Sequence, residues 1–290
     1  MRKTLTSPDA AEQLLRELAA TALDQHATEN FPVALRFLPR DVRADLLRVY
    51  TFARFVDDVG DRAPGDRLDL LERVAADVRR LPSGQAELGP VAGLAPLVPG
   101  RGLTIEPLLD LVDANRMDQT ITRYESFDDL LAYCAKSAAP VGRLVLLIAG
   151  ERNEHAMQLS DRVCAALQVL EHCQDVREDA LAGRIYLPAE ELRVAGVRDA
   201  DLCASGTSRP LRRVVATQVD RAEQLLEDGP LLIAMLRGWA RLAVSGYVAG
   251  GRATVRALRD ADCDVLAQQV RPSKPRTALG TARLVVRRDR

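Results

Sequence analysis

The chain has 290 residues, of which 47% are hydrophobic and 28% are charged, and its formal net charge is −1. This length allows one large domain or two modest ones, and this composition excludes a disordered or low-complexity chain. No uninterrupted apolar run reaches the ~18 residues that a membrane-spanning helix needs, and the polar N-terminus does not resemble a secretory signal. We therefore expect a cytoplasmic globular protein that does not span a bilayer.

The five cysteines are scattered along the chain and include no C-x-x-C pair. An odd number at irregular spacing predicts neither a disulfide framework nor a zinc knuckle, and it suits a reducing compartment. The glycines form no P-loop and no G-x-G-x-x-G fingerprint. Neither a bound nucleotide nor a nucleic-acid partner is therefore expected.

Apolar residues recur at three- and four-residue spacing along most of the chain, which is the period of amphipathic helices. Alanine, leucine, arginine and glutamate are abundant in these segments, and proline and glycine separate them. No alternating run is long enough to predict a strand, so the fold class is all-α. The expected helices cover residues 9–25, 41–58, 66–81, 105–121, 127–149, 156–182, 209–227 and 231–258.

Residues 82–102 are the main interruption, because they are rich in proline and glycine. They keep five aliphatic side chains, so we predict a loop packed against the core rather than a flexible linker. These are Leu88, Val91, Leu94, Leu97 and Val98. No repeat indicates a solenoid. We expect a single helical domain over residues 1–270.

Residues 271–290 differ from the rest of the chain in charge, since they carry seven basic residues and one acidic residue. Their net charge is +6, while the preceding residues carry −7. Basic residues near an anionic lipid surface contribute about 1 kcal/mol each to binding. We therefore predict a basic C-terminal tail that either contacts the inner face of the membrane peripherally or stays solvated.

The first candidate site lies at the end of the apolar segment 46–61, which contains Asp57, Asp58 and Asp61. Asp57 and Asp61 are four residues apart, so on a helix both carboxylates project from one face. Like charges at this spacing cost a helix about 0.2 to 0.5 kcal/mol, and the helix dipole disfavours anions at the C-terminal end. Arg54, one turn earlier, is expected to offset part of this cost. Local stability does not favour the arrangement, so it indicates a binding function.

A second acidic stripe follows on the predicted helix 156–182, where Glu171, Asp175 and Asp179 stand at four-residue steps. Gln168 lies one turn earlier, and Glu178 lies beside the stripe. The other sides of this helix are apolar, so the stripe is expected to bind a cation. Taken alone, either stripe is also typical of a solvated helix face.

Mg²⁺ is the cation that suits two aspartate stripes best. It takes oxygen ligands, keeps several waters and commonly links one or two carboxylates to substrate phosphates. Two facing stripes are therefore predicted to hold Mg²⁺ around a diphosphate. A di-iron bundle needs Glu-x-x-His and a zincin needs H-E-x-x-H, and the chain contains neither motif.

At these stripes the sequence resembles the squalene and phytoene synthase family of all-α, head-to-head prenyl synthases. The first D-x-x-x-D of the family resembles Asp57 and Asp61, preceded by an arginine at Arg54, and the second resembles Asp175 and Asp179. The resemblance covers residues 26–260. It implies an isoprenoid-synthase-type helical bundle around a central apolar cavity, with the four aspartates as catalytic Mg²⁺ ligands.

The same resemblance implies further site residues. Residues 184–188 read R-I-Y-L-P, which is characteristic of the family and places Arg184 in a diphosphate or pocket position and Tyr186 at the catalytic site. The other expected substrate contacts are Arg54, Tyr133, Gln168, Glu171, Tyr247 and Phe31. Aromatic rings among them would support a carbocation.

Two positions depart from the family pattern, because Glu171 and Gln174 stand where the family has Asn and Arg. An arginine that would contact diphosphate is thus replaced by a neutral amide. Glu171 either adds a metal oxygen or pairs with a neighbouring arginine. The adjacent His172 is expected to be packed or to face a partner rather than to act as a base, because a helix turns it about 100° away from Glu171.

Residues 29–54 and 118–134 look most like the hydroxysqualene synthase branch of bacterial hopanoid pathways. This resemblance implies conversion of presqualene diphosphate and water to hydroxysqualene and diphosphate, with Mg²⁺ and without NADPH. One alternative is a presqualene diphosphate synthase that uses farnesyl diphosphate, or a phytoene synthase. Another is an inactive helical subunit that binds sister enzymes of the pathway, although loss of an aspartate pair would then be expected.

Overall fold

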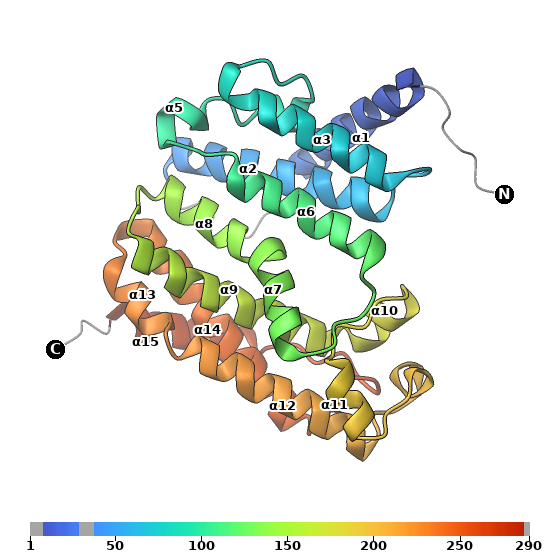
Figure 1. Cartoon of the computed structure of the whole chain (residues 1–290). Coiled ribbons are helices and arrows are strands. Elements are labelled where there is room, and N and C mark those ends of the chain that lie inside the picture. Colours follow the sequence, from blue (N-terminus) through green and yellow to red (C-terminus); the bar gives the residue numbers. More distant parts are fainter. Residues whose placement is uncertain (1–7, 29–37, 287–290) are drawn as a thin grey trace. The chain divides into compact units, whose positions relative to one another are not determined.

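A computed structural model describes the backbone of residues 8–28 and 38–286 (Figure 1). Within these ranges the regular secondary structure is helical. The β-type pairing found there is one isolated bridge between Arg123 and Ile185, and no strand forms in the described residues. The predicted all-α fold is confirmed. Contacts divide the chain into two compact units: residues up to Thr120 together with 143–151, and residues 121–142 together with 152 onward.

The first unit is built around α2 (Arg40–Asp61), which packs against α1 (Pro8–Thr28), α3 (Arg67–Arg80) and α6 (Glu106–Thr120) (Figure 1). The buried residues of α2 recur at three- and four-residue steps, and the rings of Phe52 and Phe55 are fully buried. This apolar stripe supplies the burial that holds a helix in place. It also fixes where the acidic end of α2 lies within the unit.

Residues 81–102 form three short helical turns against this unit. They are η2 (Leu81–Ser83), α4 (Gly89–Ala92) and α5 (Leu97–Arg101). Leu88, Val91, Leu94 and Leu97 are buried, and Val98 is half-buried. The prediction of a packed segment is confirmed, and the short helices within it are an addition.

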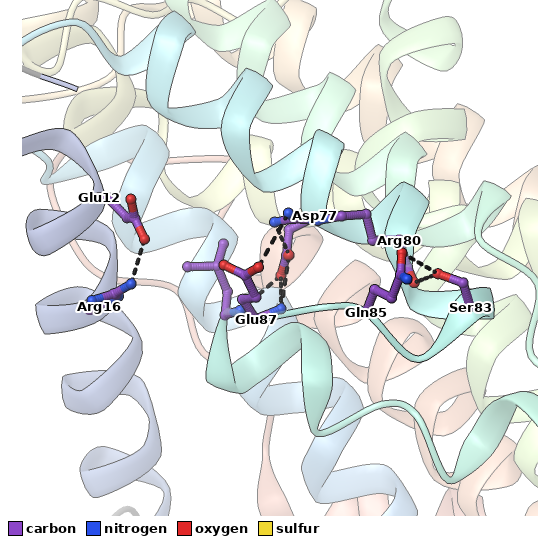
Figure 2. Close-up of polar contacts among 8 residues, drawn as sticks. Glu12, Arg16, Asp77, Arg80, Ser83, Gln85 and Glu87 are labelled. Carbon is purple, nitrogen blue, oxygen red and sulfur yellow. Dashed lines mark hydrogen bonds and ion pairs between the residues drawn. The ribbon is translucent and has the colours of Figure 1, made fainter. Parts of the chain in front are cut away.

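A buried carboxylate holds the start of this segment to α3. Asp77 is 1% exposed, and it accepts hydrogen bonds from the backbone N–H of Glu87 at 2.9 Å and of Leu88 at 2.9 Å. The Arg80 guanidinium donates to the same carboxylate at 2.7 Å (Figure 2). Glu87 accepts from Arg80 at 3.5 Å and lies largely in solvent. Asp77 is therefore the interior partner and Glu87 the peripheral one.

We expect Asp77→Ala to lower the free energy of unfolding by about 2 to 4 kcal/mol, because it removes the acceptor of one buried and one part-buried N–H group and the nearer acceptor of the Arg80 guanidinium. Glu87→Ala removes an exposed partner of the same arginine and should cost about 0 to 1 kcal/mol. Chemical denaturation of the two variants measures the difference. Equal destabilisation would contradict the interior role of Asp77.

The second unit is arranged around α9 (Glu154–Gln174), which packs against α7 (Phe127–Ser137), α12 (Arg209–Leu226), α13 (Gly229–Met235) and α14 (Gly238–Asp260) (Figure 1). Its shorter elements are α10 (Val176–Leu181), α11 (Ala189–Val194) and η3 (Asp199–Cys203). The helix α8 (Ala139–Ile148) begins in this unit and ends in the first.

Three helices that were each predicted as one continuous element are divided into two in the structure, so the predicted continuity was wrong. Helix 127–149 breaks at Ala138, two residues before Pro140, which belongs in a first turn because it has no N–H to donate. Helix 231–258 begins earlier, at Gly229, and breaks before Gly238, where φ is +54°. Helix 156–182 breaks at Asp175, with φ −102° and ψ 17°.

By length and composition, one stretch of the described chain, Phe127–Ile148, is apolar enough to cross a membrane. It is divided at Ala138 into helices of 11 and 10 residues, each shorter than the ~17 to 25 residues of a spanning helix. Of its most apolar window, 44% is buried. Buried helices in the core of a protein that does not span a membrane can also be this long and this apolar.

Beyond residue 270 the described chain continues into α15 (Lys274–Val286), which packs on α14 (Figure 1). Leu284 is buried, and a Cβ at Gly280 would lie 3.2 Å from the Ala249 Cβ, so the two helices approach closely there. The sequence did not predict this helix. The division into a domain of residues 1–270 and a tail of residues 271–290 stays a prediction.

Candidate functional site

The first acidic cluster forms the last turn of α2, as predicted. Asp57 and Asp61 are exposed, whereas Asp58 is only 3% exposed. The carboxylate of Asp58 lies 3.6 Å from Arg54 Nε and 3.1 Å from an Arg62 nitrogen. Arg54 and Arg62 therefore balance the charge of the buried Asp58, and Asp57 and Asp61 form the exposed pair of the turn.

An amide from α6 orients one carboxylate of this exposed pair. Asn115 Nδ2 donates to Asp57 Oδ1 at 3.1 Å and also contacts the Leu111 carbonyl at 3.3 Å. Gly60 makes this approach feasible, because a Cβ at that position would lie 2.1 Å from Asn115 Oδ1. Gln119 completes the contact by donating to the Gly60 carbonyl at 3.0 Å. Asn115 and Gln119 were not predicted as site residues, although their four-residue spacing on the predicted helix 105–121 was an available signal.

The electrostatic environment of Asp57 opposes its ionisation. The pKa of Asp57 is raised to about 6, first by the protein atoms that surround its carboxyl group and then by the charges of Asp61 and Asp58, although part of the side chain reaches solvent. The hydrogen bond from Asn115 and the charge of Arg54 act in the opposite direction. A bound cation would relieve the remaining repulsion.

We expect Gly60→Ala to displace Asn115 and to lower the free energy of unfolding by about 1 to 3 kcal/mol, because the added methyl group overlaps the amide. Catalytic turnover should fall with it, since Asp57 loses its orienting donor. Gly100→Ala is the matched control, as a Cβ there meets open space. Thermal unfolding and turnover measured for both variants test the contact; a Gly60→Ala protein as stable and active as the control would contradict it.

The second acidic cluster crosses the break between α9 and α10. Asp175 is the first residue outside α9, yet its N–H still bonds to the Glu171 carbonyl at 2.9 Å. The N–H of Asp179 bonds to the Asp175 carbonyl at 2.8 Å. These bonds preserve the four-residue spacing, so the stripe survives although the single predicted helix does not.

The three neighbouring acids crowd Asp175. The pKa of Asp175 is raised to about 6, first by burial and then by the charges of Glu171, Glu178 and Asp179, in that order. Glu171 is exposed and the other members of the stripe are half-buried. Like the end of α2, this turn therefore concentrates negative charge that a cation would neutralise.

An aromatic cluster lies beside this turn. Tyr124, Tyr133 and Tyr186 are 3%, 5% and 6% exposed, and their ring centroids lie 5.2 to 5.7 Å apart. Tyr133 and Tyr186 were predicted site residues, and Tyr124 was missed although it lies in the segment 118–134. Of the two expectations for His172, packed or facing a partner, the structure supports the first: it is 7% exposed and stacks on Tyr186 at 3.7 Å between ring centroids.

Backbone hydrogen bonds place the segment 184–188. Ile185 N–H donates to the Thr122 carbonyl at 2.8 Å, and Ala189 N–H donates to the Tyr124 carbonyl at 2.9 Å. Arg184 N–H donates to the Asp179 carbonyl at 2.9 Å, which joins the segment to the acidic turn. Tyr186 is thereby fixed between the acidic turn and the other two tyrosines.

The remaining predicted residues lie at separate places. Gln168 is half-buried one turn before His172, and its Nε2 lies 3.3 Å from the His172 Nε2. Gln174 donates from Nε2 to the Val270 carbonyl at 2.5 Å, so its amide is committed to the chain. Tyr247 on α14 is 54% exposed and lies outside the aromatic cluster. Phe31 lies outside the described residues.

The structure thus brings the predicted residues together in two groups. Asp57, Asp61 and Arg54 belong to the first unit. Eight others belong to the second unit, namely Gln168, Glu171, Asp175, Asp179, Tyr133, Arg184, Tyr186 and, apart from the rest, Tyr247. That the two acidic clusters face one another across an apolar cavity stays a prediction.

The donor set of the two clusters fits Mg²⁺. Within residues 10–22 and 38–286, no three His, Cys, Asp or Glu side chains gather closely enough to hold an ion by themselves. Each cluster instead offers one carboxylate with a raised pKa, Asp57 or Asp175, among other acidic side chains. Mg²⁺ is commonly held in this way, with phosphate oxygens and waters as its other ligands.

A family profile described as squalene/phytoene synthase matches residues 24–276 of the chain. A hydroxysqualene synthase of Rhodopseudomonas palustris is 36% identical over 243 residues, which are 82% of this chain and 82% of that protein. A presqualene diphosphate synthase of the same organism is 33% identical over 196 residues, which are 67% and 70% of the two chains. A crystal structure of a squalene synthase from Alicyclobacillus acidocaldarius matches with 36% identity and a TM-score of 0.78, over 88% of this chain and 97% of that one.

Proposed function

Because the chain belongs to the squalene/phytoene synthase family of enzymes, which act on prenyl diphosphates, we propose that it is a hydroxysqualene synthase. It would convert presqualene diphosphate and water to hydroxysqualene and diphosphate. The observation that carries the proposal is the 36% identity to a hydroxysqualene synthase along 82% of both chains. The 33% identity to a presqualene diphosphate synthase supports the second candidate, a head-to-head prenyl transferase.

The two acidic clusters suit the first step, which is departure of the diphosphate from carbon. Asp57, Asp61, Asp175 and Asp179 would hold Mg²⁺, which neutralises the leaving group. Arg54 and Arg184 would donate charge-assisted hydrogen bonds to the same oxygens. The C–O bond breaks with its electron pair on diphosphate and leaves a carbocation.

The buried tyrosines suit the second step, in which the carbocation rearranges before water captures it. The rings of Tyr124, Tyr133 and Tyr186 offer electron-rich faces and exclude bulk water. One water then adds to the cation and loses a proton, which gives the alcohol. The neutral Gln174, bonded to the Val270 carbonyl, leaves this turn without the cation that the family resemblance implies at that position.

We expect purified protein with Mg²⁺ and presqualene diphosphate to release diphosphate and a C30 alcohol without any nicotinamide. Mass spectrometry of the product tests this, and added NADPH should leave the product unchanged.

Asp57→Asn and Asp175→Asn should keep the helical circular dichroism and lose nearly all turnover, because each removes a carboxylate that would hold Mg²⁺.

Other products would contradict the proposal in distinct ways. Formation of presqualene diphosphate from farnesyl diphosphate would favour the second candidate, and a C40 product would favour a phytoene synthase. A protein inert toward all of these substrates would favour the inactive partner subunit. An Asp57→Asn or Asp175→Asn variant with full activity would remove that residue from the metal site.

We also propose peripheral contact with an anionic membrane through α15. The face of α15 toward α14 carries Thr277, Gly280, Thr281 and Leu284, so the opposite face is open. That face exposes Leu279 by 53% and Val286 by 78%, and Arg283 lies beside them. An apolar stripe bordered by basic residues fits an anionic lipid surface. Association with sister enzymes of the pathway stays a prediction.

The double variant Leu279→Gln, Val286→Gln should lose flotation with anionic liposomes, because it removes the apolar contacts and keeps the packing face. Leu68→Gln, at an exposed leucine of the first unit, should float like the unchanged protein. Liposomes of zwitterionic lipid should recover little of any variant. Equal flotation of the double variant and the control would contradict contact through α15.

A further inference from the structure

The imidazole of His172 is a buried polar group that the proposed reaction does not yet use. It is 7% exposed, and a buried ring nitrogen needs a hydrogen-bonding partner. Each nitrogen of this ring has a polar neighbour. Nε2 lies 3.3 Å from the Gln168 amide nitrogen, and Nδ1 lies 3.5 Å from Asp179 Oδ2.

These neighbours determine where a neutral ring carries its proton. The Gln168 amide nitrogen only donates, so Nε2 of His172 must accept. A neutral imidazole has one N–H, which then belongs to Nδ1. The nitrogen that carries the proton is therefore the one that lies 3.5 Å from Asp179 Oδ2.

Packing fixes the orientation of the ring. His172 stacks on Tyr186 with an interplanar angle of 14° and a centroid distance of 3.7 Å, and Tyr133 lies 6.2 Å away on centroids. Tyr186 itself belongs to the segment that backbone hydrogen bonds join to residues 122–124. Rotation of the imidazole about its χ angles would break this stack.

The contact also crosses the helix break. His172 belongs to α9 and Asp179 to α10, and Asp175 between them has left the helical conformation. The backbone bond from Asp179 to Asp175 holds the chain across the break but does not orient the Asp179 side chain. His172 Nδ1, 3.5 Å from Asp179 Oδ2, is a side-chain neighbour on the other side of the break.

We propose that His172 is a positioning residue, which orients the Asp179 carboxylate through its Nδ1 proton for a Mg²⁺ ion bound with diphosphate. The inference rests on the proposed function, because it takes Asp179 as a ligand of that ion. Groups that orient a metal-binding side chain commonly change metal affinity about 10- to 100-fold when they are removed.

The test is binding of Mn²⁺, as a probe for Mg²⁺, measured by electron paramagnetic resonance in the presence of inorganic diphosphate. His172→Phe keeps a ring for stacking and removes both nitrogens, so Mn²⁺ affinity should fall about 10- to 100-fold. His172→Asn places an amide nitrogen near the position of Nδ1, and affinity should stay close to that of the unchanged protein. His172→Gln places its amide near Nε2 instead, and affinity should fall as in His172→Phe.

Rescue by Asn and not by Gln separates positioning from packing, because both substitutions remove the stack on Tyr186. His155→Phe, at an exposed histidine of the same helix, should leave Mn²⁺ binding unchanged. If circular dichroism shows that His172→Phe does not fold, the difference in Mn²⁺ affinity between His172→Asn and His172→Gln still tests the positioning role.

Unchanged affinity in His172→Phe, or equal affinity in the Asn and Gln variants, would overturn the positioning role and leave the proposed function intact. Absence of Mn²⁺ binding in the unchanged protein would overturn the metal assignment, and the inference with it.

Discussion

Mutual repulsion among carboxylates is the constraint around which both acidic clusters are built. The pKa of Asp57 and that of Asp175 are each raised to about 6, by burial first and then by neighbouring acids. Such crowding costs stability in the free protein. It is tolerable because the clusters end helices whose apolar sides are buried, so that packing elsewhere keeps the acids together.

The way in which each cluster is held follows from this constraint. A cation at every carboxylate would remove the repulsion and also the affinity for a metal ion. The structure uses arginines at the buried Asp58, but it places the amide of Asn115 at Asp57 and the imidazole of His172 at Asp179. Asn115 orients its carboxylate without cancelling its charge, and His172 in its neutral form does the same. The negative charge therefore remains for a ligand.

Helical periodicity predicted the fold class and the main helices, because a helix that buries one apolar face has apolar residues at three- and four-residue spacing in its sequence. It missed the breaks at Ala138 and Asp175, since single residues interrupt a helix without changing the apolar pattern on either side. The aspartate motifs predicted the acidic turns for the same local reason. Asn115 and His172 were not predicted as site residues, because their roles depend on contacts between helices or across a break.

The joining of residues 184–189 to residues 122–124 rests on main-chain groups, namely the N–H of Ile185 and of Ala189 and the carbonyls that receive them. Main-chain bonds are indifferent to which side chains the two segments carry. Mutation can therefore exchange the rings that line this part of the molecule while the strand-like register stays the same. A library of variants at Tyr124 and Tyr186 would sample new product outcomes on an unaltered scaffold, and divergence of chemistry within one fold could proceed by the same route.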